Sequence, residues 1–149
     1  MENYFMSWLG FFLFLVLALI LIWNGKDRYA KKDWLRCGVM LIGVLVATLI
    51  IGFIFRWLSE SWSLFSIERA QQLAAVWSMS LLCLWGVKLV ITLLVAIFGN
   101  IMKFHKTHNA ENYPKITSTT DRFGPPLLVV AKVFVSLVSV LLFYGLWLD

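Results

Sequence analysis

The chain has 149 residues, of which 61% are hydrophobic and only 14% charged, and its formal net charge is +5. Four long apolar stretches hold most of its residues, and the longest connection between them is loop-sized. This arrangement excludes a separate nucleotide-binding or barrel-shaped catalytic domain, and it predicts one membrane domain that covers residues 1–149.

The four stretches predict four transmembrane helices, at about 5–23, 37–57, 73–102 and 125–148. Each supplies the roughly 20 helical residues that cross a hydrocarbon core of about 30 Å. An apolar run of this length is expected to be helical, because hydrocarbon offers no hydrogen-bond partner to a peptide group. We therefore predict an all-α integral membrane fold whose helices pair as two hairpins, without a soluble domain.

The connections between these helices differ in charge. Two of them, 24–36 and 103–124, hold nine of the basic residues: Lys26, Arg28, Lys31, Lys32, Arg36, Lys103, Lys106, Lys115 and Arg122. The connection between the second and third helices holds only Arg69 against Glu60 and Glu68. Because short cytoplasmic loops carry the Lys/Arg excess, 24–36 and 103–124 are predicted to be cytoplasmic and both termini to lie outside. Contact of the cations with anionic headgroups is a secondary expectation.

The first predicted helix is bracketed by two tryptophans, Trp8 and Trp23, which are typical of the two membrane interfaces. Asn24-Gly25 is expected to end it. The amino terminus lacks the cationic start and the small-residue cleavage site of a secretory signal peptide, so this helix is expected to be retained.

The second predicted helix contains small residues four apart, in Gly43-xxx-Ala47 and Thr48-xxx-Gly52. Such pairs let two membrane helices approach closely, although ordinary glycine usage explains the pattern equally well. The connection that follows is interpreted as a surface turn, with a helix start at Ser66 as the alternative.

The third predicted helix, 73–102, has 30 residues and would be about 45 Å long, which exceeds the hydrocarbon core. It must tilt, or its first part must lie at the interface. A lone cation at mid-bilayer is costly, so the position of Lys88 distinguishes between these two placements of the helix. We expect Trp77 and Trp85 near the outer interface and Lys88 reaching outward. The alternative is a buried Lys88 that serves ion passage or pairs with a partner.

The third connection contains His105 and His108, but neighbouring lysines oppose a metal ion there, and no metal site is expected. Pro125 and Pro126 suit the first turn of the fourth helix, because their missing N–H groups are not needed there. Lys132, Ser136 and Ser139 share one face at helical spacing with Phe143, and we expect this face to meet other helices.

Catalytic groups are missing from the apolar stretches. The two histidines lie in a basic connection, no nucleophile–base–acid set can be assembled, and Cys37 and Cys83 are interpreted as small buried apolar residues. The sequence predicts a protein that is not an enzyme and that takes no cofactor.

The second half of the chain carries a more specific pattern. A span with Val87-Lys88-Leu89 leads into a basic connection, then Thr117-Ser118-Thr119-Thr120-Asp121-Arg122, then an apolar span with Lys132 that ends in Leu141-Leu142-Phe143-Tyr144-Gly145-Leu146. This resembles the first two conserved membrane helices of the small-conductance mechanosensitive channel (MscS) family, and the upstream spans look like the extra amino-terminal helices of its five-helix branch. In that family the pore helix and the cytoplasmic vestibule would follow Asp149.

The resemblance implies a membrane-tension-sensing helical paddle in the bacterial inner (cytoplasmic) membrane, in contact with lipid and part of a homo-oligomer, a heptamer in that family. Packing, lipid contact or hinge roles are expected at Gly43, Ala47, Gly52, Lys88, Lys132, Ser136, Ser139, Pro125 and Pro126. The alternative is a stand-alone accessory or immunity protein that binds another membrane protein helix to helix. A weaker third reading is a small transporter or channel that uses Lys88 for anions.

Overall fold

The computed structural model describes residues 2–24, 30–62, 66–108, 111 and 113–149. In chain order these residues form four helices: α1 (Glu2–Trp23), α2 (Lys31–Trp62), α3 (Ile67–His108) and α4 (Tyr113–Trp147). Each contains an apolar stretch that is long enough to cross a membrane. The all-α fold with four candidate spans is therefore confirmed.

The helices are longer than the apolar stretches that predicted them. The expected loop 24–36 is wrong from Lys31 onward, and most of the expected loop 103–124 is helical. Local caps explain two of the starts: the Asp33 carboxylate accepts the Ala30 N–H (3.0 Å), and the Ser66 hydroxyl accepts the Arg69 N–H (3.3 Å). The helix start at Ser66 is thus the alternative that the structure shows.

We expected the two adjacent prolines to begin the last helix, but they do not. Pro125 and Pro126 lie in the interior of α4, and Pro114 instead occupies its first turn. The polar residues before the proline pair are helical too. The prediction missed them because hydropathy measures suitability for a bilayer and not for a helix. The proline pair leaves two carbonyl oxygens one turn earlier without their usual backbone donors.

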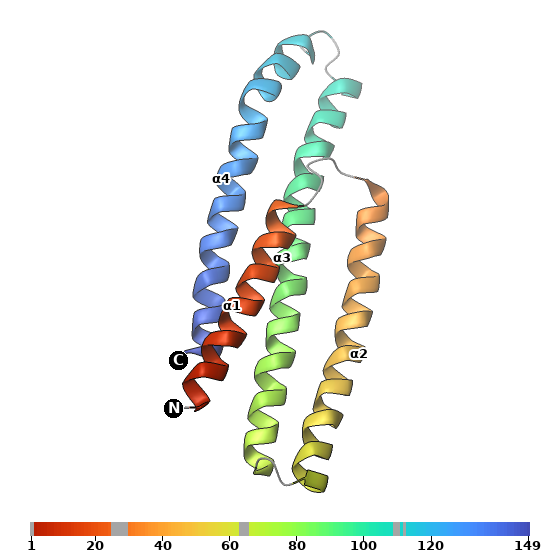
Figure 1. Ribbon diagram of the computed structural model, residues 1–149. Coiled ribbons are helices and arrows are strands. Elements are labelled where there is room, and N and C mark those ends of the chain that lie inside the picture. The colour runs from red at the N-terminus through yellow and green to blue at the C-terminus, as the bar shows by residue number, and fades with distance from the viewer. Residues whose placement is uncertain (1, 25–29, 63–65, 109–110, 112) are drawn as a thin grey trace.

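α3 is the central helix of the bundle and contacts the other three, whereas α2 contacts α3 alone (Figure 1). The predicted pairing of the first two helices is wrong, because the described residues of α1 and α2 make no contact with each other. α1 instead packs against α3 and α4. Its residues Phe14, Ala18 and Ile22 follow helical spacing and are at most 2% exposed, so they form a stripe that suits the interior.

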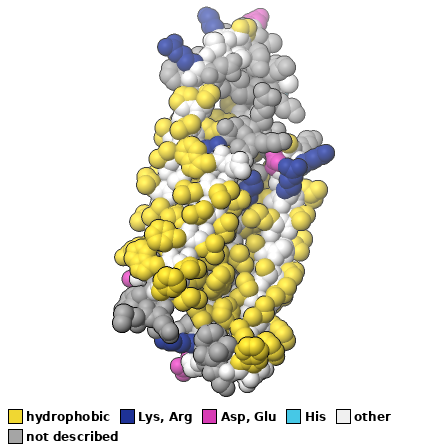
Figure 2. All heavy atoms as spheres, viewed as in Figure 1, with side chains coloured by type: hydrophobic (Ala, Val, Ile, Leu, Met, Phe, Trp, Pro, Cys, Tyr) yellow, Lys and Arg dark blue, Asp and Glu magenta, His cyan; other side chains and the backbone are white. Residues whose placement is uncertain are grey.

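α2 is the outermost helix of the bundle. Only 6% of the residues in its apolar stretch are buried, so most of its side chains are at least partly exposed. Apolar side chains cover much of the molecular face in Figure 2, as expected for a surface in contact with hydrocarbon. The start of α1 and the end of α4 lie toward the end of the bundle at which α2 ends and α3 begins (Figure 1).

Candidate functional site

Aromatic rings from three helices hold α1 inside the bundle. The Phe14 ring stacks on Phe143 and Trp147, with centroids 6.0 and 5.7 Å apart, and meets the edge of Trp77 at 5.3 Å. Gly10 lies directly against the Trp147 ring, and a Cβ atom at this position would overlap that ring. Only glycine therefore allows α1 and α4 to approach so closely at this point.

A hydrogen-bond relay joins the end of α4 to α3 beside these rings. The Trp147 indole N–H donates to the Ser80 hydroxyl (2.9 Å), which donates to the Val76 carbonyl (2.8 Å). Ser80 is fully buried. Each polar group of the relay is thus satisfied in an apolar setting, where an unmade hydrogen bond would be costly.

A buried cation lies where α1 ends. Lys132 of α4 is only 4% exposed, and its Nζ lies 5.9 Å from the centre of the Trp23 ring. The Trp23 indole N–H donates to the Ser136 hydroxyl (3.3 Å), which donates to the Lys132 carbonyl (2.8 Å). With Ser139 and Phe143 fully buried, the face that the sequence predicted for contact with helices lies inside the bundle.

We expected Lys88 near the outer interface, on the side of the second connection, but it lies far from that connection along α3. It is 21 residues beyond the start of α3 at Ile67, or about 32 Å along the helix. The indole N–H of nearby Trp85 donates to the Cys37 carbonyl (3.0 Å), close to the start of α2. Lys88 therefore lies at the end of α2 that follows the first connection. The outward reach of Lys88 stays a prediction, since the apolar stretch of α3 extends on both sides of this residue.

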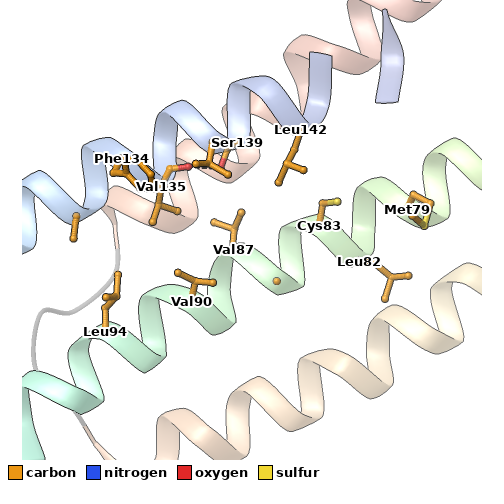
Figure 3. A pocket seen from close by; sticks show the side chains of 13 residues that line it. Met79, Leu82, Cys83, Val87, Val90, Leu94, Phe134, Val135, Ser139 and Leu142 are labelled. Carbon is orange, nitrogen blue, oxygen red and sulfur yellow. Dashed lines mark hydrogen bonds between the residues drawn. The ribbon is translucent and has the colours of Figure 1, made fainter. Parts of the chain in front are cut away.

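An apolar groove lies between α3 and α4 and has a volume of about 600 Å³. We call it the α3–α4 groove. Its walls are shown in Figure 3. They consist of Met79, Leu82, Cys83, Gly86, Val87, Val90 and Leu94 of α3 and of Ala131, Phe134, Val135, Val138, Ser139 and Leu142 of α4.

The chemistry of the α3–α4 groove suits a hydrocarbon ligand. The Ser139 hydroxyl is its one strongly polar side-chain group, and it already donates to the Val135 carbonyl of its own helix (2.8 Å; Figure 3). The volume lies in the range of small-molecule sites, about 300–1,000 Å³. Sequence reasoning missed this groove, because its lining residues are of the same kind as those that face lipid.

The small residues of α2 are placed differently from one another. Gly43 is exposed, and no atom lies within 4 Å of the position that a Cβ would take. Ala47 is half-buried. Gly52 lines a cleft of about 410 Å³ between α2 and α3, beside an ion pair in which the Arg56 Nε lies 2.8 Å from the Glu60 Oε1. Among the described residues, the close helix approach predicted from spacing is therefore not made at Gly43.

Several other candidates lie partly outside the described residues. Lys26 and Arg28 are outside them, as are the side chains of Lys103, His105 and Lys106. Within the described part of the chain, no three His, Cys, Asp or Glu side chains come together as a metal site. The His108 ring stacks on Phe104 at 4.6 Å, and Cys37 and Cys83 are both free thiols.

Four membrane-length apolar helices, three of them packed around the central α3, define a multi-pass α-helical membrane protein. No protein-family model, no curated protein and no solved structure matches the chain. The α3–α4 groove, the buried Lys132 and the helix contacts are therefore the features that bear on its function.

Proposed function

We propose that this chain is a membrane-tension-sensing helical domain, similar to the paddle of small-conductance mechanosensitive channels, and that it acts without catalysis. The observation that carries the proposal is the α3–α4 groove. Its volume and apolar lining suit a lipid acyl chain, and it is formed by the two helices whose sequences resemble that family. The pore helix and the vestibule of such a channel are not part of these 149 residues.

The physical mechanism is a shift between two states of different in-plane area. An acyl chain in the groove stabilises the resting state, which has the smaller in-plane area. Membrane tension favours the state of larger area and draws lipid back into the thinned bilayer. α2 can follow a tilt of α3 without breaking other contacts, because its described residues contact α3 alone.

The same proposal includes orientation and assembly. Both termini would face outward, with the basic connections in the cytoplasm of a bacterium, since Lys/Arg excess follows the inner side. The chain would form a homo-oligomer, with seven copies if it assembles like the family it resembles. Native mass spectrometry from lipid nanodiscs measures this copy number directly.

Filling the groove is expected to exclude lipid from it. Gly86 lines the groove, and the position of its missing Cβ is open space, so Gly86→Leu adds apolar volume without a clash. We expect crosslinking by a phosphatidylcholine with a diazirine on its acyl chain to fall at least about fivefold on the groove-lining peptides. Mass spectrometry of the crosslinked peptides measures the yield.

Gly38→Leu is the matched control, because Gly38 is exposed on α2 and also has open space at its Cβ position. It is expected to leave the groove crosslinks unchanged. If Gly86→Leu also leaves them unchanged, lipid does not occupy the groove and the proposal loses its basis.

A second candidate function is helix-to-helix binding of another membrane protein, as in an accessory or immunity protein. The exposed, open position of Gly43 favours it, because a close helix approach there is left unused within the chain. This function predicts that a different membrane protein co-purifies in fixed ratio and is lost on Gly43→Leu. Such a result would favour this candidate over the tension sensor.

A further inference from the structure

The ends of the four helices are not level with one another at the end of the bundle opposite to the termini (Figure 1). α1 ends at Trp23, and the neighbouring Ile22 packs in one cluster with Val87 and Ile91 of α3. α3 continues to His108, 17 residues or about 25 Å beyond Ile91. We call the projecting part the distal arm: residues 92–108 of α3 and 113–131 of α4.

The base of the distal arm has an apolar surface that the other described residues leave exposed. Six of its aliphatic side chains are between 38% and 64% exposed: Leu93, Ile97, Ile101, Leu127, Val129 and Val130. No charged residue occurs between Thr92 and Met102 or between Gly124 and Ala131. This surface therefore continues the lipid-facing surface of α3 and α4 past the end of α1.

The bundle consequently has two hydrophobic lengths. The apolar span of α1, Phe5–Trp23, has 19 residues and is about 28 Å long. The apolar stretch of α3, residues 73–102, has 30 residues and is about 45 Å long. A flat hydrocarbon core of about 30 Å matches the shorter length and leaves the arm base outside, where water contact is unfavourable.

The cations of this end of the bundle lie at two levels: Arg36, Lys88 and Lys132 near the place where α1 ends and α2 begins, and the basic residues of the arm tip. Lys132, at the level where α1 ends, is 4% exposed and lies beside the Trp23 ring, so protein atoms surround most of its side chain. The sequence of the arm tip is basic, with Lys103, Lys106, Lys115 and Arg122 against Glu111 and Asp121. This charge complements anionic headgroups and opposes the arm of a second copy.

We propose that the occupant of the apolar arm base is bilayer hydrocarbon, and that the bundle responds to bilayer thickness. In a thick bilayer the arm base enters the hydrocarbon and the basic tip reaches the headgroups. In a thin bilayer the arm base emerges into the headgroup layer and water. Mismatch of this kind is relieved by tilting or by local deformation of the bilayer. The inference concerns a different surface from the α3–α4 groove and does not depend on lipid occupying that groove.

The test is thiol labelling in vesicles of graded thickness. Ile97→Cys is made in a Cys37→Ser, Cys83→Ser background and reconstituted in phosphatidylcholine with a minor share of phosphatidylglycerol. The monounsaturated chains are varied from fourteen to twenty-two carbons. A water-soluble maleimide is loaded on both sides of the membrane. We expect the labelling rate of Ile97→Cys to fall at least about tenfold between the thinnest and the thickest bilayer.

Two positions calibrate the labelling. Leu49→Cys, 75% exposed on α2, is expected to remain unlabelled at every thickness. Glu111→Cys, exposed at the arm tip, is expected to be labelled at every thickness. A rate at Ile97→Cys that is independent of chain length overturns the inference. If that constant rate is slow and rises when the protein is diluted in lipid, a second copy covers the arm instead.

Discussion

Replacing Gly10 by leucine is expected to separate α1 from α4 and to lower the free energy of unfolding by about 1–3 kcal/mol, the usual cost of overpacking. The Trp147 ring occupies the space that the new side chain needs. The ring cannot simply rotate away, because it stacks on Phe14 and its indole N–H is bonded to Ser80. Relief of the overlap therefore breaks the relay or moves α1.

Reversible unfolding in mixed micelles with a rising fraction of dodecyl sulfate, followed by tryptophan fluorescence, measures this loss. Gly38→Leu is the matched control, because it adds the same side chain to an exposed position on α2 with open space around it. Equal midpoints for the two variants would show that α1 and α4 do not approach closely at Gly10.

Truncating Phe14 to alanine is expected to be the most destabilising single change and to lower the free energy of unfolding by about 3 kcal/mol. Phe14 is 2% exposed and touches aromatic rings from α3 and α4 at once. The estimate takes the low end of the range for Phe→Ala in protein cores, because lipid supplies no hydrophobic transfer term and only packing is lost.

Phe12→Ala removes the same side chain from the same helix at a position that is 54% exposed. We expect it to shift the unfolding midpoint little, because lipid chains fill the vacated space. If Phe12→Ala lowers the unfolding midpoint as much as Phe14→Ala does, the side of α1 that faces the bundle has been assigned wrongly.

The number and type of the helices could be predicted from hydropathy alone. Their bounds could not, because hydropathy reports which residues suit hydrocarbon, and polar segments also form helix. Tyr113–Phe123 is the clearest case: it precedes the apolar stretch, yet it belongs to α4. The same confusion placed Pro125 and Pro126 at a helix start.

The partners of each helix were harder to predict than the helices. Helical spacing identified the face with Lys132, Ser136 and Ser139, because polar side chains mark it among apolar neighbours. α1 carries no such polar side chains on its buried face, and its packing against α3 and α4 depends on the fit of Gly10 and Phe14 to particular rings. The α3–α4 groove could not be predicted from the sequence for a related reason: its lining has the composition of a lipid-facing surface.

The most direct test of the central claim measures lipid in the α3–α4 groove as membrane tension changes. The diazirine-bearing lipid is crosslinked in vesicles with increasing lysophosphatidylcholine in one leaflet, which imposes tension on the other. We predict that crosslinks to the groove-lining peptides fall several-fold, while those around Leu49, which is 75% exposed on α2, stay constant. Groove crosslinks that do not change, or that change in parallel with those at Leu49, would contradict a groove that responds to tension.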